Sequence, residues 1–598
     1  MERRERWFIF LLFSGALFLR LIYMLFLREH YFFYDNPSAD VKYYLDWARE
    51  IAFKDPIGNQ AFFGLPLYPY FLAVLYRLSL GHIEVIRLFQ ITLGSLNCVL
   101  IYLAGKEMFH SRKIGAVAGI LSAVTFTLIY YDWLLMPVTL IISLSLIILL
   151  SLLNRHILTR PRQWLILGLL LGLATLGDGK FLFITLMASV WLYLDQRKTA
   201  RLRQVVILLC GFLLVLGTCA LRNRLVSGDW ILISAQSGLS LYAGNNPQAT
   251  GTFANPEYIR PTHEGQDEDQ KIVAESIAGK NLSPAEVSAF WKNRALDFIL
   301  REPGQYTALL LRKARLFFTD TEYAYDLDLI LQRRWKEMLD INGVTLLFAL
   351  AFIGMAVSWR RRPGSRIALI FILAQLMMSL IFFVSSRHRA AIIPFLILFE
   401  AAALGWLLTT VRQRRILPAA TAIIFIAFMM TVFQPVDLPA RDLAFIRHAK
   451  SGPVYEQRGD LAQARSQYQQ AIKLRPGDTN SWYNLANTYV HTGDLQRAKQ
   501  LYQHVLDICS FHIDAAFNLA YVYDRLGEYD RALSYYRKVL RFQPEKPDTL
   551  YHLARIHARQ GHCEQAREYY RQLMTLQPDL KPDLKKDLAA GLNSCDLE

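Results

Sequence analysis

Residues 34–47 read YDNPSADVKYYLDW and directly follow an apolar run, residues 7–27, that is long enough to cross a bilayer. Apolar side chains recur at helical spacing through this stretch, at Val41, Tyr44, Leu45, Ala48 and Ile51. Ser38 is a suitable helix cap, which places Asp40 in the first turn, where the helix dipole favours a charged carboxylate. The stretch therefore predicts an ionised acid at the membrane surface. Asp40 then either stabilises the N-terminus of this helix or takes part in catalysis.

The composition is that of a membrane protein. Of the 598 residues, 53% are hydrophobic, and the long apolar runs lie before about position 432. The sequence after that position is polar and rich in Tyr and Gln. The net charge of +16 comes largely from short basic clusters between apolar runs, as the positive-inside rule requires. We therefore exclude nucleic acid as a partner.

The six cysteines lack the spacing of a metal site, and we interpret most of them as core residues. A disulfide among Cys509, Cys563 and Cys595 stays open. The N-terminal run has the basic flank of a signal peptide but no small-residue cleavage site, so we predict that it is retained as the first span.

Eleven apolar segments predict an all-α, polytopic transmembrane bundle. Two short segments, 164–176 and 181–194, flank Gly177-Asp178-Gly179-Lys180 and are too long together for one crossing. A hairpin of two short helices leaves every basic cluster on the cytoplasmic side, with the N-terminus inside and the C-terminal domain outside. The other nine predicted spans are 7–27, 84–104, 114–131, 137–153, 205–221, 343–358, 367–384, 390–410 and 416–433.

Two long loops fall on the outer face in this topology, residues 28–83 and 222–341. The second loop contains Asn245 and Asn246 in a turn-rich stretch that suits either a hydroxyl-rich ligand or a structural loop. The sequence of this loop also predicts two helices, at about 283–301 and 304–318. The basic residues of the second helix are expected to lie along lipid headgroups.

Asp132 lies on the same face, and no cation is near it in sequence to neutralise it. Acidic residues near membrane depth are costly and are usually paired or functional. We expect Lys180, Arg387 and Arg389 to face this carboxylate or to hold an anion. The structural alternative is that these cations mark span ends and extend to headgroups.

The C-terminal third is a repeat array with a 34-residue period. This step separates Gly459, Gly493, Gly527 and Gly561, then Ala464, Ala498, Ala532 and Ala566, and then Tyr468, Tyr502, Tyr536 and Tyr570. Such a period with Gly, Ala, an aromatic residue and Pro in this order is the tetratricopeptide pattern. We predict repeats at about 446–479, 480–513, 514–547 and 548–581, followed by a capping helix and tail. Such arrays bind peptides or proteins on a concave face, although a spacer role is the alternative.

Several short motifs of residues 1–435 resemble the membrane-embedded C-type glycosyltransferases, in particular the protein O-mannosyltransferase-like family in a version with tetratricopeptide repeats. The matching pieces are Asp40-Val-Lys-Tyr43-Tyr44, Leu65-Pro66-Leu67-Tyr68-Pro69-Tyr70, Gly172-Leu173-Ala174, Arg222-Asn223, Gly244-Asn245-Asn246-Pro247 and Ser386-Arg387-His388-Arg389. The resemblance implies a membrane glycosyltransferase domain at 1–435 and a repeat domain at 436–598.

The resemblance makes Asp40 the catalytic base and calls for a second acid near the turn before the fourth span. Val138 stands where the family has its acid, so Asp132 would serve. The implied donor is a polyprenyl-phosphate-linked sugar, with a divalent Mg²⁺ or Mn²⁺ at Asp40 and Asp132 left open. The residues expected at the carrier phosphate are Lys180, Arg222, Arg387, His388 and Arg389. Those expected to bind substrate are Tyr43, Tyr44, Tyr68, Asn245 and Asn246.

The acceptor is a protein, a glycan or a lipid, and the repeats are expected to present it or to bind a peptide or protein partner. We place the chain in the bacterial inner membrane with periplasmic repeats, or in the endoplasmic reticulum membrane with luminal repeats. Two other functions stay open. An O-antigen ligase or polysaccharide polymerase would use Arg and His of an outer loop and spare Asp40. A non-catalytic membrane scaffold would act through its repeats alone.

Overall fold

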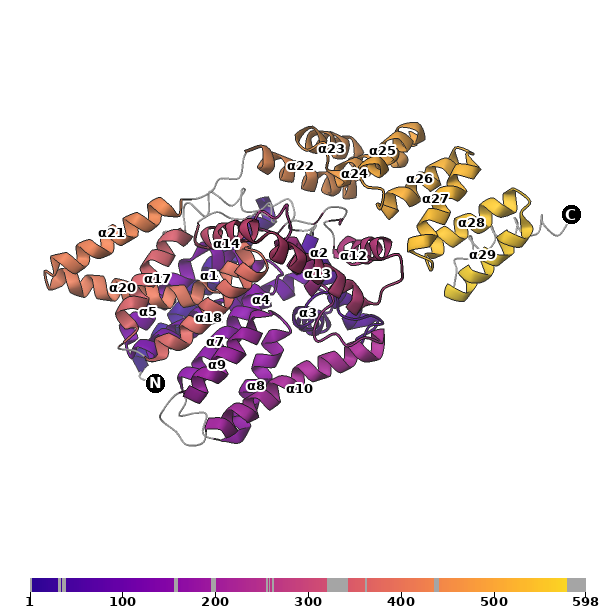
Figure 1. The fold of residues 1–598 in the computed structure, drawn as a ribbon. Helices are drawn as coiled ribbons and strands as arrows, with labels where there is room; N and C mark the ends of the chain where they lie inside the picture. The colour runs from indigo at the N-terminus through magenta and orange to yellow at the C-terminus, as the bar shows by residue number, and fades with distance from the viewer. Residues whose placement is uncertain are drawn as a thin grey trace. The chain divides into compact units, whose positions relative to one another are not determined.

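The computed structural model describes residues 3–30, 34, 39–154, 160–194, 201–253, 256, 259–260, 263–319, 343–360, 363–434 and 440–577. Within these residues the regular structure is helical, apart from one parallel bridge between Thr252 and Val384 (Figure 1). The chain divides into two compact units. The first comprises 1–256, 261–267 and 278–437, and the second comprises 257–260, 268–277 and 438–598. Ser38 and the predicted capping helix after residue 581 lie outside the described residues.

Each of the eleven predicted membrane segments falls on a helix of the first unit, because each apolar run buries its backbone polar groups only when it is helical. The third segment is divided between two helices. These helices are α1 (Arg3–His30), α4 (Ile83–Phe109), α5 (Arg112–Val124), α6 (Phe126–Trp133), α7 (Val138–Leu153), α8 (Pro161–Thr175), α9 (Lys180–Leu194), α10 (Arg201–Ser227), α17 (Val344–Ser358), α18 (Pro363–Ile381), α20 (Ile393–Arg412) and α21 (Ile416–Val432).

Length and apolarity alone make five of these helices able to cross a membrane, namely α1, α4, α10, α18 and α20. The pair α5 and α6 bends by 57° and adds a sixth if it forms one span. The apolar helices α7, α9, α17 and α21 are shorter. The chain is therefore an integral membrane protein with several spans.

The remaining helices of the first unit come from the segments between spans. They are α2 (Ala39–Phe53), α3 (Leu67–Leu78), α11 (Ser237–Gly244), α13 (Pro284–Arg301), α14 (Pro303–Phe318) and α19 (Ser386–Ala390), while α12 (His263–Ala278) is shared between the two units. Helices α2 and α3 share an apolar core that includes Leu45, Ala48 and Leu72. The buried face of α2 is thus the apolar stripe seen in the sequence, and this packing fixes the helix that carries Asp40.

The second unit contains four consecutive helix pairs with the predicted spacing. They are α22 (Ala440–Gln457) with α23 (Leu461–Leu474), α24 (Thr479–His491) with α25 (Leu495–Ile508), α26 (Ile513–Arg525) with α27 (Tyr529–Phe542), and α28 (Pro547–Arg559) with α29 (Cys563–Leu576). The repeated alanines are fully buried, as are Tyr468, Tyr502 and Tyr536. The repeated glycines have φ between 73° and 80°, a conformation that ends the first helix of each pair.

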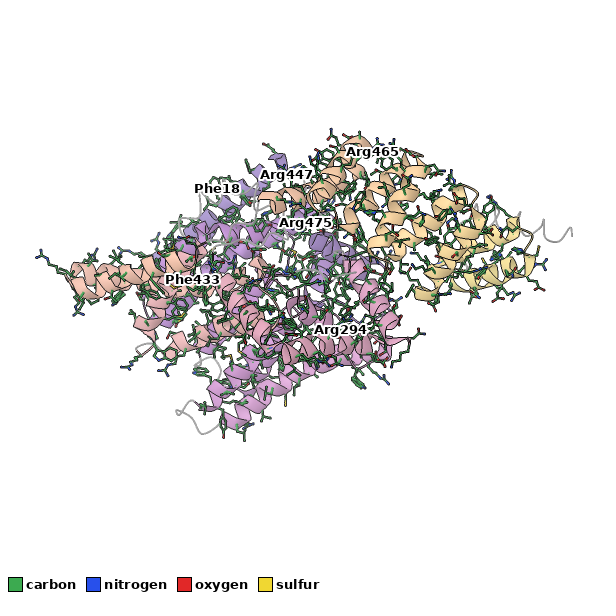
Figure 2. All side chains as sticks on the ribbon, turned by 45° about the horizontal axis from the view of Figure 1, so that its top comes forward. Phe18, Arg294, Phe433, Arg447, Arg465 and Arg475 are labelled. Atoms are coloured by element: carbon green, nitrogen blue, oxygen red, sulfur yellow. The ribbon has the colours of Figure 1, made fainter. Side chains whose placement is uncertain are left out.

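Arg465 and Arg475 of the array are labelled in Figure 2, and the guanidinium of each lies over an aromatic ring. The guanidinium of Arg475 lies 4.2 Å from the ring centroid of Phe445, and that of Arg465 lies 5.5 Å from the ring of Tyr489. Such contacts add to the packing of the first repeat.

Three of the cysteines are core residues, as expected, and Cys210 is not. Cys98, Cys219 and Cys509 are buried free thiols, and Cys210 is an exposed one. Cys563 is disulfide-bonded.

Candidate active site

The first turn of α2 presents Asp40 to a basic residue of α19. The Nη1 atom of Arg387 donates to Oδ2 of Asp40 at 2.5 Å, and the two side chains are 32% and 20% exposed. Helix α19 has only five residues and begins after Ser385, whose hydroxyl accepts from the His388 N–H at 3.4 Å. Two residues that the sequence placed in the site are therefore in contact.

A second ion pair occupies the turn between α8 and α9. Lys180 Nζ lies 2.8 Å from Oδ2 of Asp178 and donates to Oε1 of Gln375 at 3.1 Å. Burial would raise the pKa of the Asp178 carboxyl, but the charge of Lys180 and the hydrogen bonds from Lys180 hold that pKa below its ordinary value. Lys180 is thus neutralised by a carboxylate two residues away.

His388 interacts electrostatically with both pairs. Burial, followed by the positive charge of Arg387, lowers the pKa of His388 to about 4, while Asp178 opposes the shift. The imidazole is therefore neutral at pH 7 and offers hydrogen bonds rather than positive charge. The sequence had placed it among the phosphate-binding cations.

Aromatic rings cover the adjoining face of α2. The rings of Tyr43 and Tyr44 lie 5.5 Å apart, and Tyr44 contacts Tyr68 edge-on at 5.3 Å. Burial raises the pKa of Tyr44 to about 12, so its hydroxyl stays protonated. The Tyr68 hydroxyl donates to Gln90 at 2.6 Å, and Gln90 in turn donates to the Leu134 carbonyl at 2.5 Å. Tyr68 thereby links α3 to α4 and to the turn before α7.

An open cavity of about 540 Å³ lies along α2 and is lined in part by Tyr43, Trp47 and Glu50. Asp40 is not among its lining residues, and Tyr43 is one helical turn from it. Arg222 closes another side. Its guanidinium donates to the carbonyls of Ile57 and Gln60 and stacks on the Phe62 ring at 3.8 Å. The predicted phosphate ligand Arg222 therefore holds the loop that forms the cavity wall.

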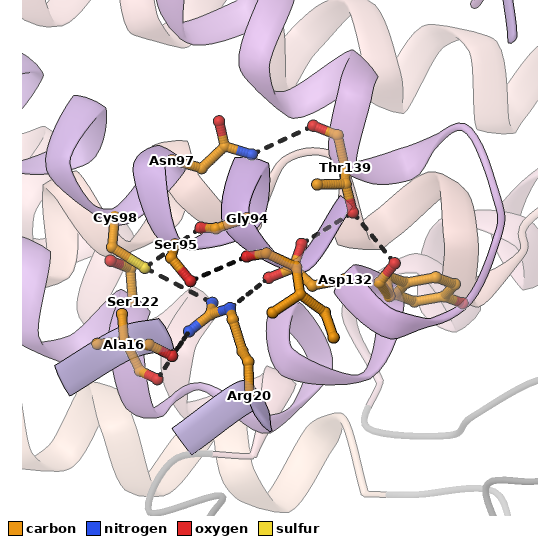
Figure 3. A network of polar contacts seen from close by, with 12 residues as sticks. Ala16, Arg20, Gly94, Ser95, Asn97, Cys98, Ser122, Asp132 and Thr139 are labelled. Atoms are coloured by element: carbon orange, nitrogen blue, oxygen red, sulfur yellow. Dashed lines mark hydrogen bonds and ion pairs between the residues drawn. The ribbon is translucent and has the colours of Figure 1, made fainter. Parts of the chain in front are cut away.

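Asp132 is part of a buried network inside the helix bundle (Figure 3). Arg20 Nε donates to Oδ2 of Asp132 at 2.7 Å, and the Thr139 hydroxyl donates to Oδ1 at 2.8 Å. The same guanidinium donates to the Ala16 carbonyl at 3.2 Å. The Arg20 and Asp132 side chains are only 1% and 5% exposed.

The network corrects the cations that the sequence suggested for Asp132. The cation that pairs with it is Arg20 of α1, rather than Lys180, Arg387 or Arg389. Gly94 is essential to the fit, since a Cβ there would lie 2.1 Å from the Asp132 carboxyl carbon. Both carboxylate oxygens of Asp132 are thus engaged within the bundle, whereas Asp40 pairs with Arg387 on α19.

The side chains of three other predicted ligand residues form hydrogen bonds with main-chain groups. Arg389 is buried and donates to the carbonyls of Leu316 and Thr319. Asn245 donates to the Ile381 carbonyl at 2.7 Å and accepts from Lys313 Nζ at 2.9 Å. Asn246 has a similar role.

The Asn246 amide donates to the Tyr242 carbonyl at 2.8 Å, and its oxygen accepts from the Gln248 N–H at 2.8 Å. The prediction that the basic residues of α14 lie along headgroups is wrong for Lys313, which is fully buried. Burial lowers the pKa of Lys313 to about 8.

Sequence reasoning missed four residues of these networks, namely Asp178, Gln375, Lys313 and Arg20. A signal existed for Arg20, because an arginine in the middle of an apolar run is costly and is usually paired. No feature of the sequence marked Gln375 as a partner of a buried charge.

The described residues contain no group of three or more His, Cys, Asp and Glu side chains that could hold a metal ion. The divalent ion left open at Asp40 and Asp132 therefore lacks a coordination shell of these types in the described part of the chain.

Part of the membrane region is similar to a known protein family. Residues 61–221 match the family model described as dolichyl-phosphate-mannose-protein mannosyltransferase. Within these residues the membrane region is similar to this mannosyltransferase family, and we call it the mannosyltransferase-type region. The match includes Tyr68, Asp132 and Lys180 of the mannosyltransferase-type region, and it ends before Arg222. Asp40 and Arg387 lie outside it.

The C-terminal region matches three tetratricopeptide repeat models, at residues 452–493, 478–545 and 515–580. Similar solved structures include the crystal structure of MamA, with 18% identity, a TM-score of 0.22, and coverage of 28% of this chain and 93% of that one. Another is YrrB, described as a TPR protein with an unusual peptide-binding site, with 16% identity, a TM-score of 0.24, and coverage of 26% and 84%. No curated protein matches the chain.

Proposed function

We propose that the mannosyltransferase-type region transfers a sugar from a polyprenyl-phosphate-linked donor to an acceptor hydroxyl on the outer face, with Asp40 as general base. The observation that carries this proposal is the ion pair between Asp40 and Arg387. A guanidinium is suited to bind phosphate through paired N–H donors. A donor phosphate that takes Arg387 would release the Asp40 carboxylate for proton transfer.

The reaction is a single displacement. Asp40 takes the proton of the acceptor hydroxyl as that oxygen bonds to the anomeric carbon. The bond between this carbon and the phosphate oxygen breaks at the same time, and the polyprenyl phosphate leaves with the bonding electrons. Arg387 stabilises the charge that develops on the leaving phosphate. Displacement on the face opposite the leaving group inverts the anomeric centre.

The other residues take roles according to their contacts. Lys180 is a weaker phosphate ligand than Arg387, because its side chain is 1% exposed against 32% for Arg387 and is held by both Asp178 and Gln375. We assign the cavity beside Tyr43 and Trp47 to the acceptor, since aromatic faces and open polar edges suit a hydroxyl-bearing group. Asp132 has a structural role in this assignment, through Arg20.

The outer face is the side on which we place the site and the repeat array. The disulfide bond of Cys563 supports this orientation, because disulfides persist in oxidising compartments outside the cytosol. The array then presents an acceptor or binds a partner on the same side as Asp40.

The test uses membranes that contain the full chain and a radiolabelled polyprenyl-phosphate mannose as the probe donor. Asp40→Asn is expected to lower transfer by about 10²–10⁴-fold, the usual contribution of a general base. The matched control is Asp297→Asn, which alters an exposed acid on α13, and both variants must show wild-type melting in detergent. Full activity of Asp40→Asn would refute the proposal.

The alternatives give other outcomes in the same assay. An O-antigen ligase-like enzyme predicts loss of activity in His388→Ala while Asp40→Asn stays active. A scaffold predicts that neither substitution has an effect, whereas deletion of residues 446–598 does.

A further inference from the structure

A segment of the second long outer loop belongs to the repeat array. By sequence, residues 257–277 lie between spans of the mannosyltransferase-type region. In the structure, residues 257–260 and 268–277 form part of the second compact unit, together with residues 438–598. The last three turns of α12 thus pack with the repeats.

Arg260 is the polar anchor of this segment. Its guanidinium forms an ion pair with Asp514, in the first turn of α26, and its side chain is 14% exposed. The same group donates to Asp269 at 2.9 Å and to Glu268 at 2.7 Å, and both acids come from α12 itself. The segment is therefore folded around its own arginine, and the array contributes Asp514.

Asp514 has a second cationic neighbour and two aromatic side chains close by. Lys546 Nζ lies 3.5 Å from Oδ1 of Asp514 and is the counter-charge that the array itself supplies. The rings of Tyr483 and His512 lie 4.9 Å apart, and both groups interact electrostatically with Arg260. His512 is 3% exposed. This partly desolvated environment strengthens a guanidinium–carboxylate contact.

Ile272 is the apolar anchor. It is 3% exposed and belongs to the apolar cluster of the array, which includes Ala486 of α24 and Leu519 of α26. Burial of this apolar side chain stabilises the contact between the segment and the repeats. One arginine and one isoleucine, twelve residues apart, therefore hold this segment of the second unit against the first helices of successive repeats.

We propose that residues 259–260 and 268–277 are an intramolecular ligand of the repeat array, and that a partner peptide bearing an arginine reaches Asp514 only by displacing them. The array then selects for a guanidinium next to an apolar helix face. The loop lowers the apparent affinity of any such peptide, because the binding-competent array is only the fraction from which the loop is released.

The test uses the full chain and a fluorescent synthetic peptide of residues 256–279. The peptide should bind at least about tenfold more tightly to the chain with Arg260→Ala and Ile272→Ser than to the wild type, because the competing loop is weakened. Addition of Asp514→Asn should abolish that gain. The matched control, Asp530→Asn, alters an exposed acid on α27 and should leave the gain intact.

Hydrogen exchange of α24 and α28 amides checks that the variants keep the fold of the array. In the chain with Arg260→Ala and Ile272→Ser, which we call the released chain, residues 265–277 should exchange faster than in the wild type. Equal peptide affinity for wild type and released chain would overturn the proposal, as would absence of binding to both. Insensitivity of the gain to Asp514→Asn would also overturn it.

Discussion

The Asp40 carboxylate and the Arg387 guanidinium are 347 residues apart in the chain and form an ion pair of 2.5 Å between helices α2 and α19. Both side chains are partly exposed, so the pair contributes little to stability by itself. In the proposed mechanism Arg387 exchanges partners, because a guanidinium can leave a carboxylate for a phosphate at small cost.

We expect Arg387→Ala to weaken binding of farnesyl phosphate, a short soluble carrier, by at least about tenfold, the loss of one charge-assisted hydrogen bond. Arg387→Lys should restore only part of the affinity, because an ammonium lacks the paired donors of a guanidinium. Titration calorimetry on the purified chain measures both. The control is Arg301→Ala, an exposed residue of α13. Unchanged affinity in Arg387→Ala would remove Arg387 from the phosphate site.

The buried pair of Arg20 and Asp132 should behave as a unit. Arg20→Met alone leaves an unpaired buried carboxylate and is expected to destabilise the chain by about 3–5 kcal/mol, whereas Arg20→Met with Asp132→Leu should cost much less. Reversible unfolding in mixed detergent micelles measures the free energies. If the two single losses simply add in the double variant, the residues are not coupled.

The pH dependence of stability should report His388. Its pKa is about 4 in the folded chain and about 6.5 when unfolded. Between these values the unfolded chain binds a proton that the folded chain does not, so the free energy of unfolding falls as the pH drops from 6.5 to 4. The His388→Gln variant should show a smaller fall in melting temperature over this range. Parallel curves for the two proteins would contradict the burial of this imidazole.

The repeat glycines should be intolerant of side chains. Gly527 has φ of 78°, and Gly527→Ala is expected to destabilise the array by about 1–2 kcal/mol, the cost of a left-handed non-glycine residue. Gly477→Ala is the matched control, since a Cβ there meets no atom within 4 Å and its φ is not left-handed. Hydrogen exchange of α26 and α27 amides in the full chain measures the change. Equal protection in both variants would contradict this explanation.

The elements of the fold could be predicted because their signals are local. Span-length apolar runs locate the membrane helices, and a 34-residue step in Gly, Ala and Tyr locates the array. Asp40, Lys180 and Arg387 could be selected as site residues, since each is a charged group near a span end on one predicted face.

The partners of these charges could not be predicted, because they lie far away in sequence. Asp132 has no cation near it in sequence, and its partner Arg20 lies 112 residues before it. Gln375 contacts Lys180 across 195 residues. Lys313 lies in a basic stretch whose composition favours exposure to solvent. Its ammonium is buried because it donates hydrogen bonds to Asn245 and to the Leu380 carbonyl.

Membrane insertion of α8 and α9 during synthesis should depend on the pair formed by Asp178 and Lys180. Neither helix is long enough to be a stable span by itself, and the ribosome completes α8 before α9 exists. Two opposite charges at the tip cross the bilayer as a neutral unit at far lower cost than either charge alone. We expect the translocon to insert α8 and α9 together as a hairpin, so that the turn with Asp178 and Lys180 crosses the bilayer first.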